Sequence, residues 1–107
     1  MVTKHDFDSL ISALHTQLRR EYGDRLRDIY LYGSHSKGTA SSETDVDIAI
    51  ILNEIESRFL ERQRCSGFIT DISLKYDAVI HFIFIDEKEF NSQNYSLFRN
   101  IKNDGIS

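Results

Sequence analysis

Two aspartates, Asp45 and Asp47, are separated by one residue at the start of an apolar segment that continues to Leu52. Side chains alternate between the two faces of a β-strand, so both carboxylates would project from one face, with Cα atoms about 6.6 Å apart. At an effective dielectric constant near 20, two negative charges at that separation repel each other by about 2.5 kcal/mol. A divalent cation with oxygen ligands, above all Mg²⁺, would relieve this repulsion. Taken alone, the pair is a weak signal, because acidic residues also flank strands as solvated loop ends.

A third aspartate, Asp77, opens a later apolar segment that runs to Ile85. If that segment forms a strand beside the one that carries Asp45 and Asp47, its carboxylate can join the other two. Three acidic groups at neighbouring strand ends suit a two-metal site for phosphoryl chemistry. We therefore take Asp45, Asp47 and Asp77 as the candidate catalytic and metal-binding residues.

A loop of small residues precedes the aspartate pair. Gly33 follows the run Asp28–Tyr32, and a glycine there lets backbone amides approach a phosphate closely. The Ser34 hydroxyl could then donate to a triphosphate, and Lys37 supplies a positive charge in the loop. A Gly-Ser turn is common, but Gly-Ser followed after ten residues by Asp-x-Asp arises by chance in roughly one chain in a thousand of this length.

The elements that must position these residues follow from the spacing of the apolar side chains. Spacings of three and four residues predict helices, over about residues 4–22, 54–74 and, after Asp86, up to Gly105. Short apolar runs predict strands over 28–32, 46–52 and 77–85. The last of these is apolar on both faces, which indicates a strand that is central or covered by helices. The order α-β-loop-β-α-β-α predicts an α/β (α+β) fold, a small mixed β-sheet with helices packed on it.

Length and composition limit the classes of function. A chain of 107 residues is one domain, 1–107. With 13 basic and 17 acidic residues, and a net charge of -4, we expect no bulk electrostatic binding of nucleic acid. A single cysteine excludes an intramolecular disulfide and a cysteine-based zinc cluster, and it fits a reducing compartment. Apolar stretches fall far below the roughly 20 residues of a membrane span, and the first ten residues are charged where a signal peptide would be apolar. We expect a soluble, cytoplasmic domain with no membrane contact.

Other titratable residues have simpler explanations. By alternation His81 would share the face of Asp77, and a place in the core or at its rim is favoured over a role as catalytic base. Phe82 and Phe84 would lie on the other face, in the core. The arginines and glutamates between positions 54 and 64 are typical of a solvated helix face.

The stretch Gly33 to Asp47 resembles the signature of the nucleotidyltransferase superfamily related to DNA polymerase β. More closely, it resembles the minimal nucleotidyltransferases, the antitoxin half of HEPN/MNT toxin–antitoxin pairs. Residues 75–80, Lys-Tyr-Asp-Ala-Val-Ile, are similar to the family's third-carboxylate strand, and residues 98–106 look like its final helix and glycine stop. Family members are similarly short, so the resemblance covers nearly the whole chain. It implies a polymerase β palm-like fold.

The resemblance also implies a reaction: ATP bound with Mg²⁺, attack by an acceptor hydroxyl on the α-phosphate, and release of pyrophosphate. Asp45 and Asp47 would carry the ions of a two-ion site, and Asp77 would help to bind one ion and take the proton of the acceptor. The cofactor-binding positions carried over are Gly33, Ser34, Lys37 and Thr44. In the family the acceptor is often a tyrosine of the partner HEPN ribonuclease, which adenylylation silences.

The loop departs from the family pattern at two positions. His35 and Lys37 stand where many relatives have arginines, so the bidentate fork is lost. Thr44 keeps the hydroxyl that usually precedes the first aspartate. Since the three carboxylates are present, an active enzyme is favoured. Two alternatives stay open: an inert antitoxin of the same fold that neutralises a HEPN partner by complex formation, and nucleotidyl transfer to a small molecule, with an acceptor pocket supplied by a partner or a homo-oligomer.

Overall fold

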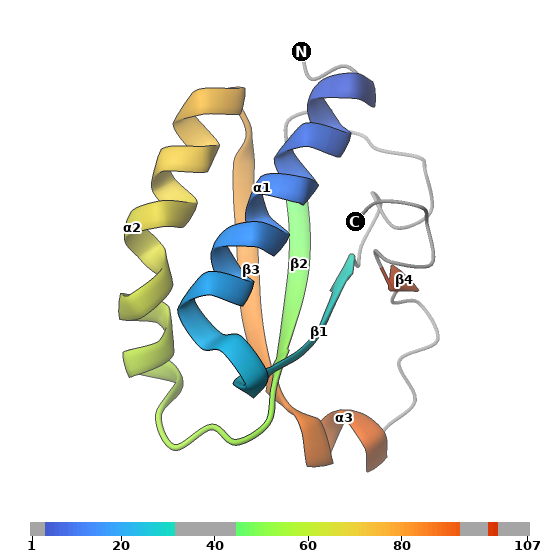
Figure 1. Ribbon diagram of the computed structural model, residues 1–107, viewed down its shortest axis with the longest axis vertical. Coiled ribbons are helices and arrows are strands. Elements are labelled where there is room, and N and C mark those ends of the chain that lie inside the picture. The colour runs from blue at the N-terminus through green and yellow to red at the C-terminus, as the bar shows by residue number, and fades with distance from the viewer. Residues whose placement is uncertain (1–3, 32–44, 93–98, 101–107) are drawn as a thin grey trace.

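The computed structural model describes residues 4–31, 45–92 and 99–100. The elements along the chain are α1 (Lys4–Tyr22), a 3₁₀ turn η1 (Gly23–Arg25), β1 (Leu26–Leu31), β2 (Asp45–Leu52), α2 (Arg58–Tyr76), β3 (Val79–Asp86), α3 (Glu87–Ser92) and β4 (Arg99–Asn100). The sheet order is β3-β2-β1-β4. β2 runs parallel to β3 and antiparallel to β1, and β4 is antiparallel to β1. The predicted mixed sheet with helices packed on it is therefore confirmed (Figure 1).

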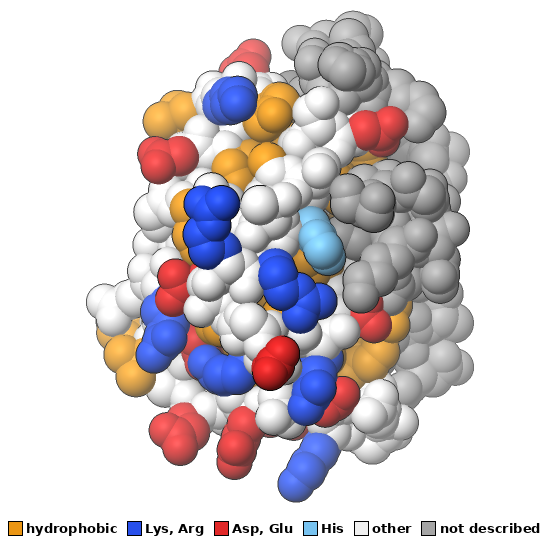
Figure 2. Space-filling model, in the orientation of Figure 1, with side chains coloured by type: hydrophobic (Ala, Val, Ile, Leu, Met, Phe, Trp, Pro, Cys, Tyr) orange, Lys and Arg blue, Asp and Glu red, His pale blue; other side chains and the backbone are white. Residues whose placement is uncertain are grey.

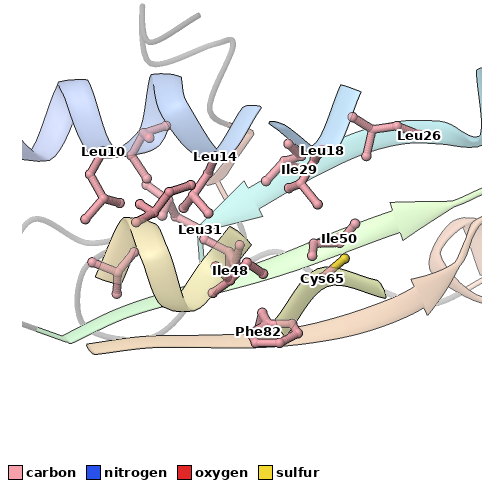
Figure 3. Close-up of a cluster of buried hydrophobic side chains, with 14 of the residues drawn as sticks. Leu10, Leu14, Leu18, Leu26, Ile29, Leu31, Ile48, Ile50, Cys65 and Phe82 are labelled. Atoms are coloured by element: carbon pink, nitrogen blue, oxygen red, sulfur yellow. The ribbon is translucent and has the colours of Figure 1, made fainter. Parts of the chain in front are cut away.

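Helices α1 and α2 lie side by side over one face of the sheet (Figure 1). The stripe of α1 that the apolar spacing predicts is buried, and Leu10, Leu14 and Leu18 are at most 1% exposed. These side chains meet Ile48 and Ile50 of β2 in the main core (Figure 3). Because every second residue of β2 points into this core, the residues between them must point to the opposite face of the sheet.

On the opposite face, the residues that the structure describes cover only part of the length of the sheet. Ala49, Ile51 and Ile85 form a small second core there. Tyr30 and Phe90 pack against it, with ring centroids 4.8 Å apart. Toward the start of β3 the side chains on this face are exposed, Val79 to 47% and Ile83 to 38%, so this part of the sheet is accessible to a ligand.

Helix and strand boundaries follow the sequence pattern with local differences. The first helix is confirmed over its predicted length. The second begins at Arg58 and not near residue 54, because Ser57 is its N-cap and accepts a hydrogen bond from Leu60 N at 3.3 Å. Phe82 and Phe84 lie in the core, as predicted.

The prediction of one last helix up to Gly105 is wrong. α3 ends at Ser92, and Arg99–Asn100 forms the short strand β4 beside β1. Asn91, Ser92 and Asn94 are poor helix formers, which favours an early end. The pairing gives backbone groups of β1 hydrogen-bond partners, which a helix at this position would not supply.

Strand β3 lies at an edge of the sheet, and two arginines of α2 reach over this edge. Arg62 donates to the carbonyl oxygen of Phe82 at 2.7 Å, and Arg58 donates to that of Phe84 at 3.1 Å. The Arg62 guanidinium also lies 4.3 Å from the centroid of the Phe82 ring. Unpaired carbonyls on an edge strand are a template for pairing with another chain. The two arginines therefore block this edge.

We expect the double variant Arg58→Gln/Arg62→Gln to self-associate, because it frees two edge carbonyls while the fold stays intact. Light scattering after size-exclusion chromatography across a concentration series should show a rising average mass. The matched control is Arg20→Gln/Lys88→Gln, which removes the same charge from exposed side chains that, among the described residues, make no hydrogen bond to a carbonyl of β3. Equal masses for the two double variants would show that the edge needs no protection.

A buried polar cluster joins the end of α1 to the first turns of α2. The Tyr22 hydroxyl lies 3.1 Å from Cys65 Sγ and 3.3 Å from the carbonyl oxygen of Glu61. Glu61 itself is only 5% exposed, and its Oε2 accepts from Arg25 at 2.7 Å. The prediction that this glutamate belongs to a solvated helix face is therefore wrong. Burial raises the pKa of the Cys65 thiol to about 11. It also raises the pKa of the Tyr22 hydroxyl well above its ordinary value.

These shifts predict a loss of stability at alkaline pH. Because the folded state holds both protons more tightly than the unfolded chain, the stabilisation is complete below pH 9 and falls as pH rises through 11. Urea unfolding at pH 8, 10 and 11 should show a steep decline for the wild type. In Cys65→Ala the decline should be shallower by about 2 kcal/mol between pH 8 and 11. Parallel curves for the two proteins would contradict this assignment.

The helix-covered surface carries Lys and Arg among Asp and Glu side chains, with no broad patch of one sign on its described part (Figure 2). Among the helices described here, none is both long and apolar enough to cross a membrane.

Candidate active site

The aspartate pair lies at the first and third positions of β2. Val46, Ile48, Ile50 and Leu52 point into the core beneath the helices, so Asp45, and Asp47 with it, must project to the opposite, partly open face. Both are half-buried. The sequence prediction that the two carboxylates share one face of a strand is confirmed.

Neither carboxylate of the pair has a hydrogen bond or an ion pair to any residue that the structure describes. Two half-buried anions on one face repel each other, and carboxylate oxygens are the ligands that a hard divalent cation prefers. The donor set therefore fits Mg²⁺. Over residues 4–31, 45–92 and 99–100, no three His, Cys, Asp or Glu side chains gather closely enough to hold a metal ion.

Asp77 lies at the end of α2 and not within β3. Its backbone is left-handed, with φ 52° and ψ 50°, and its N–H donates to Leu74 O at 3.4 Å. Aspartate tolerates this conformation as a helix C-cap better than most residues. The strand begins two residues later, at Val79, so the expected alternation from Asp77 to His81 does not hold.

Asp77 is nevertheless near the start of the aspartate strand. Its side chain is exposed and lines a shallow cavity of about 180 Å³ together with Ser73, Leu74 and Val79. Val79 is the in-register neighbour of Asp45 across the parallel pair. The structure therefore places Asp77 at the same end of the sheet as Asp45, in a cavity that residues of α2 help to line. It does not bring Asp77 into a three-carboxylate cluster with Asp45 and Asp47.

His81 is the in-register neighbour of Asp47 on β3. Phe82 points into the main core, so His81 must point to the face that carries the aspartates. It is exposed. Of the two positions predicted for His81, the core is therefore excluded, whereas a place at the rim of the core is consistent with its exposure.

The remaining predicted site residues, Gly33, Ser34, Lys37 and Thr44, lie outside the described residues. Their segment connects Leu31 to Asp45, and Leu31 pairs with Ile48. Both ends of the segment are therefore at the end of the sheet where the aspartates lie.

The sequence matches the family described as "Nucleotidyltransferase domain" over residues 11–104. A Methanocaldococcus jannaschii relative, provisionally named protein adenylyltransferase MJ0604, is 32% identical over 89 residues, which cover 82% of this chain and 83% of the relative. Protein adenylyltransferase MntA of Thermococcus cleftensis is 35% identical over 63 residues, covering 57% of this chain and 62% of the relative.

Two solved structures share the fold. A provisionally named nucleotidyltransferase from Sulfolobus solfataricus superimposes with a TM-score of 0.67 at 18% identity, over 88% of this chain and 78% of that chain. A chain of a mutant toxin–antitoxin complex MntA-HpeT superimposes with a TM-score of 0.51 at 19% identity, over 81% of this chain and 68% of that chain. The predicted nucleotidyltransferase fold is thus confirmed, as is the resemblance to the minimal members. With a family match over residues 11–104, the chain belongs to the family of nucleotidyltransferase domains.

Proposed function

We propose that this nucleotidyltransferase transfers AMP from ATP, with Mg²⁺, to a tyrosine hydroxyl of a HEPN-type ribonuclease toxin in the cytoplasm, and so acts as an antitoxin. The observation that carries the proposal is the aspartate pair itself. Asp45 and Asp47 are half-buried on one open face and have no partner among the described residues. Unpaired acidic groups in this arrangement are typical of a site that is completed by a cation and a polyphosphate.

The proposed roles follow from place and chemistry. Asp45 and Asp47 hold the divalent ions, and the segment with Gly33 and Ser34 grips the triphosphate. Mg²⁺, when bound, offsets phosphate charge and polarises the α-phosphoryl group. The role of Asp77, to accept the proton of the acceptor hydroxyl, rests on the family resemblance and not on its place, because Asp77 lies outside a cluster with the pair. A bond forms between the acceptor oxygen and the α-phosphorus, the bond from that phosphorus to the β-phosphate oxygen breaks, and pyrophosphate leaves.

The partner is inferred from the relatives. Several carry the name protein adenylyltransferase, and one fold match is to a chain of a toxin–antitoxin complex. A tyrosine acceptor on a HEPN protein is consistent both with these names and with the acidic site. No further domain is needed for such a reaction if the partner brings the acceptor to the open face.

The test is transfer of label. The protein is incubated with ATP labelled at the α-phosphate, Mg²⁺ and the product of the neighbouring gene, and the labelled residue is identified by mass spectrometry. We expect AMP on a tyrosine of the partner and loss of its ribonuclease activity. Neutralisation of the partner without any label would instead support the inert binding protein, and label only on small molecules would support the third alternative.

A second test needs no partner. Mg-ATP at a hundred times its Kd should stabilise the fold by about 2.7 kcal/mol, which corresponds to a rise in Tm of about 10 °C for a domain of this size. Differential scanning fluorimetry with Mg-ATP, with ATP plus EDTA, and with Mg²⁺ alone separates the stabilisation by the metal ion from that by the nucleotide. Since the shift depends on the aspartates, Asp45→Asn/Asp47→Asn should show little of it. An unchanged Tm of the wild type over a wide range of Mg-ATP would contradict the site.

A further inference from the structure

His81 occupies a position that the proposed roles leave unused. It is paired in register with Asp47, and neighbouring strands in a sheet lie about 4.8 Å apart. Its side chain is exposed on the face of the aspartates and has no hydrogen bond or ion pair to any residue within the described ranges. A polar side chain this close to Asp47 would lie within reach of any group that the aspartate holds.

The surroundings of His81 favour a substrate contact over a packing role. Its neighbours along the same face of β3 are Val79, 47% exposed, and Ile83, 38% exposed. Neither covers the imidazole. The Tyr30 and Phe90 rings pack against Ala49, Ile51 and Ile85, further along the sheet. His81 therefore lies at the boundary between the covered part of this face and the open part that holds the carboxylates.

We propose that His81 is a substrate-positioning residue whose imidazole N–H donates a hydrogen bond to a non-bridging oxygen of the ATP α-phosphate. This inference rests on the proposed function. A neutral imidazole carries one N–H donor, so the contact needs no additional charge. Donation to an anionic oxygen is the class of hydrogen bond with the larger effect on binding. Of the described side chains beside Asp47 on the neighbouring strand, His81 is the one that can donate.

The experiment measures nucleotide binding with Mg²⁺ and α,β-methylene-ATP, an analogue that cannot release pyrophosphate by the normal bond cleavage. Isothermal titration gives the Kd, and ³¹P NMR reports the environment of the α-phosphorus. His81→Leu removes the donor at similar size, and His81→Gln keeps an amide N–H near the place of Nε2. Ile83→Thr is the matched control on the same strand and face.

We expect His81→Leu to raise the Kd about tenfold to a hundredfold, the range for a hydrogen bond to a charged group, and to shift the bound α-phosphorus resonance. His81→Gln should recover binding to within about threefold of the wild type, and Ile83→Thr should bind like the wild type. Because His81 is exposed, all variants should keep their Tm within a few degrees. Equal Kd values and α-phosphorus resonances for His81→Leu and the wild type would overturn the proposal for His81.

Failure of the proposed function gives a different result. In that case the wild type does not bind α,β-methylene-ATP with Mg²⁺, or Asp45→Asn/Asp47→Asn binds it as tightly as the wild type does. Either result refutes both proposals. If binding needs the aspartates but is indifferent to His81→Leu, the site stands and only the role of His81 is refuted.

Discussion

Replacing Asp45 and Asp47 together by asparagine should lower AMP transfer by at least about a thousandfold, since metal-ion stabilisation of a phosphoryl transition state is worth several kcal/mol and each 1.36 kcal/mol is a factor of ten. Asparagine keeps the size and polarity of each side chain but removes the negative charges that would hold the cations. The fold should survive, because neither carboxylate has a hydrogen bond or ion pair to the described residues. The measurement is the initial rate of label transfer at saturating Mg-ATP, together with the Tm of the free protein.

A charge-matched control separates the site from the change in net charge. Asp24→Asn/Asp71→Asn removes two exposed carboxylates on a turn and on α2, and it should transfer AMP at the wild-type rate. Without nucleotide, Asp45→Asn/Asp47→Asn should melt at the wild-type temperature or above it, because the repulsion between the two carboxylates is removed. A double variant that transfers within tenfold of the wild type would exclude these residues as the metal site.

Removing Arg25 should destabilise the protein by about 2 kcal/mol, less than for breaking a fully buried ion pair, because Arg25 is partly exposed and Arg64 also lies 3.8 Å from Glu61 Oε1. The guanidinium of this arginine donates to Glu61 Oε2 at 2.7 Å and to the carbonyl oxygen of Glu54 at 2.6 Å. Its side chain is 37% exposed, whereas that of Glu61 is 7% exposed. Arg25→Met would therefore leave a carboxylate buried without its main partner, which costs more than the lost contact alone. Urea unfolding at pH 7 measures the loss.

The double variant Arg25→Met/Glu61→Leu is the informative control. It removes the buried charge together with its partner, so it should recover most of the stability lost in Arg25→Met. If Arg25→Met stays within 0.5 kcal/mol of the wild type, the ion pair does not join η1 to α2 in the way we describe. A double variant that is less stable than Arg25→Met would show that Glu61 is tolerated in its pocket without charge compensation.

The sequence pattern correctly predicts the helices and strands that have one buried apolar face. The spacing of Leu10, Leu14 and Leu18 locates α1, and the alternation along β2 places Asp45 and Asp47 on one face. Both predictions depend only on local periodicity, which the backbone geometry of a helix or strand enforces. The structure and the comparisons confirm the fold class for the same reason.

Features that depend on nonlocal partners were missed. Arg58 and Arg62 look like solvated helix residues until β3 is known to be an edge strand whose carbonyls lie within their reach. Glu61 precedes Cys65 and Ile69 by one and two turns on the buried stripe of α2, and that spacing was an available signal. β4 forms because the edge of β1 is free to pair, which local propensity does not encode.

Asp77 and His81 show the same limit within the site. Apolar residues follow Asp77 directly, so the sequence pattern extends the strand back to it, whereas a left-handed C-cap delays the strand to Val79. The register of β3 against β2 then brings His81, and not Asp77, directly beside Asp47. Register between parallel strands is set by packing across the whole sheet, and the sequence of either strand alone does not determine it.

The central claim is that Asp45 and Asp47 hold divalent ions and a nucleotide on the open face of the sheet. The most direct measurement is a crystal structure with Mn²⁺ and α,β-methylene-ATP, in which anomalous scattering locates the metal. We predict manganese within about 2.2 Å of carboxylate oxygens of both aspartates, with the α-phosphate on the His81 side. Manganese and nucleotide bound elsewhere, with the two aspartates left without a cation, would contradict the account.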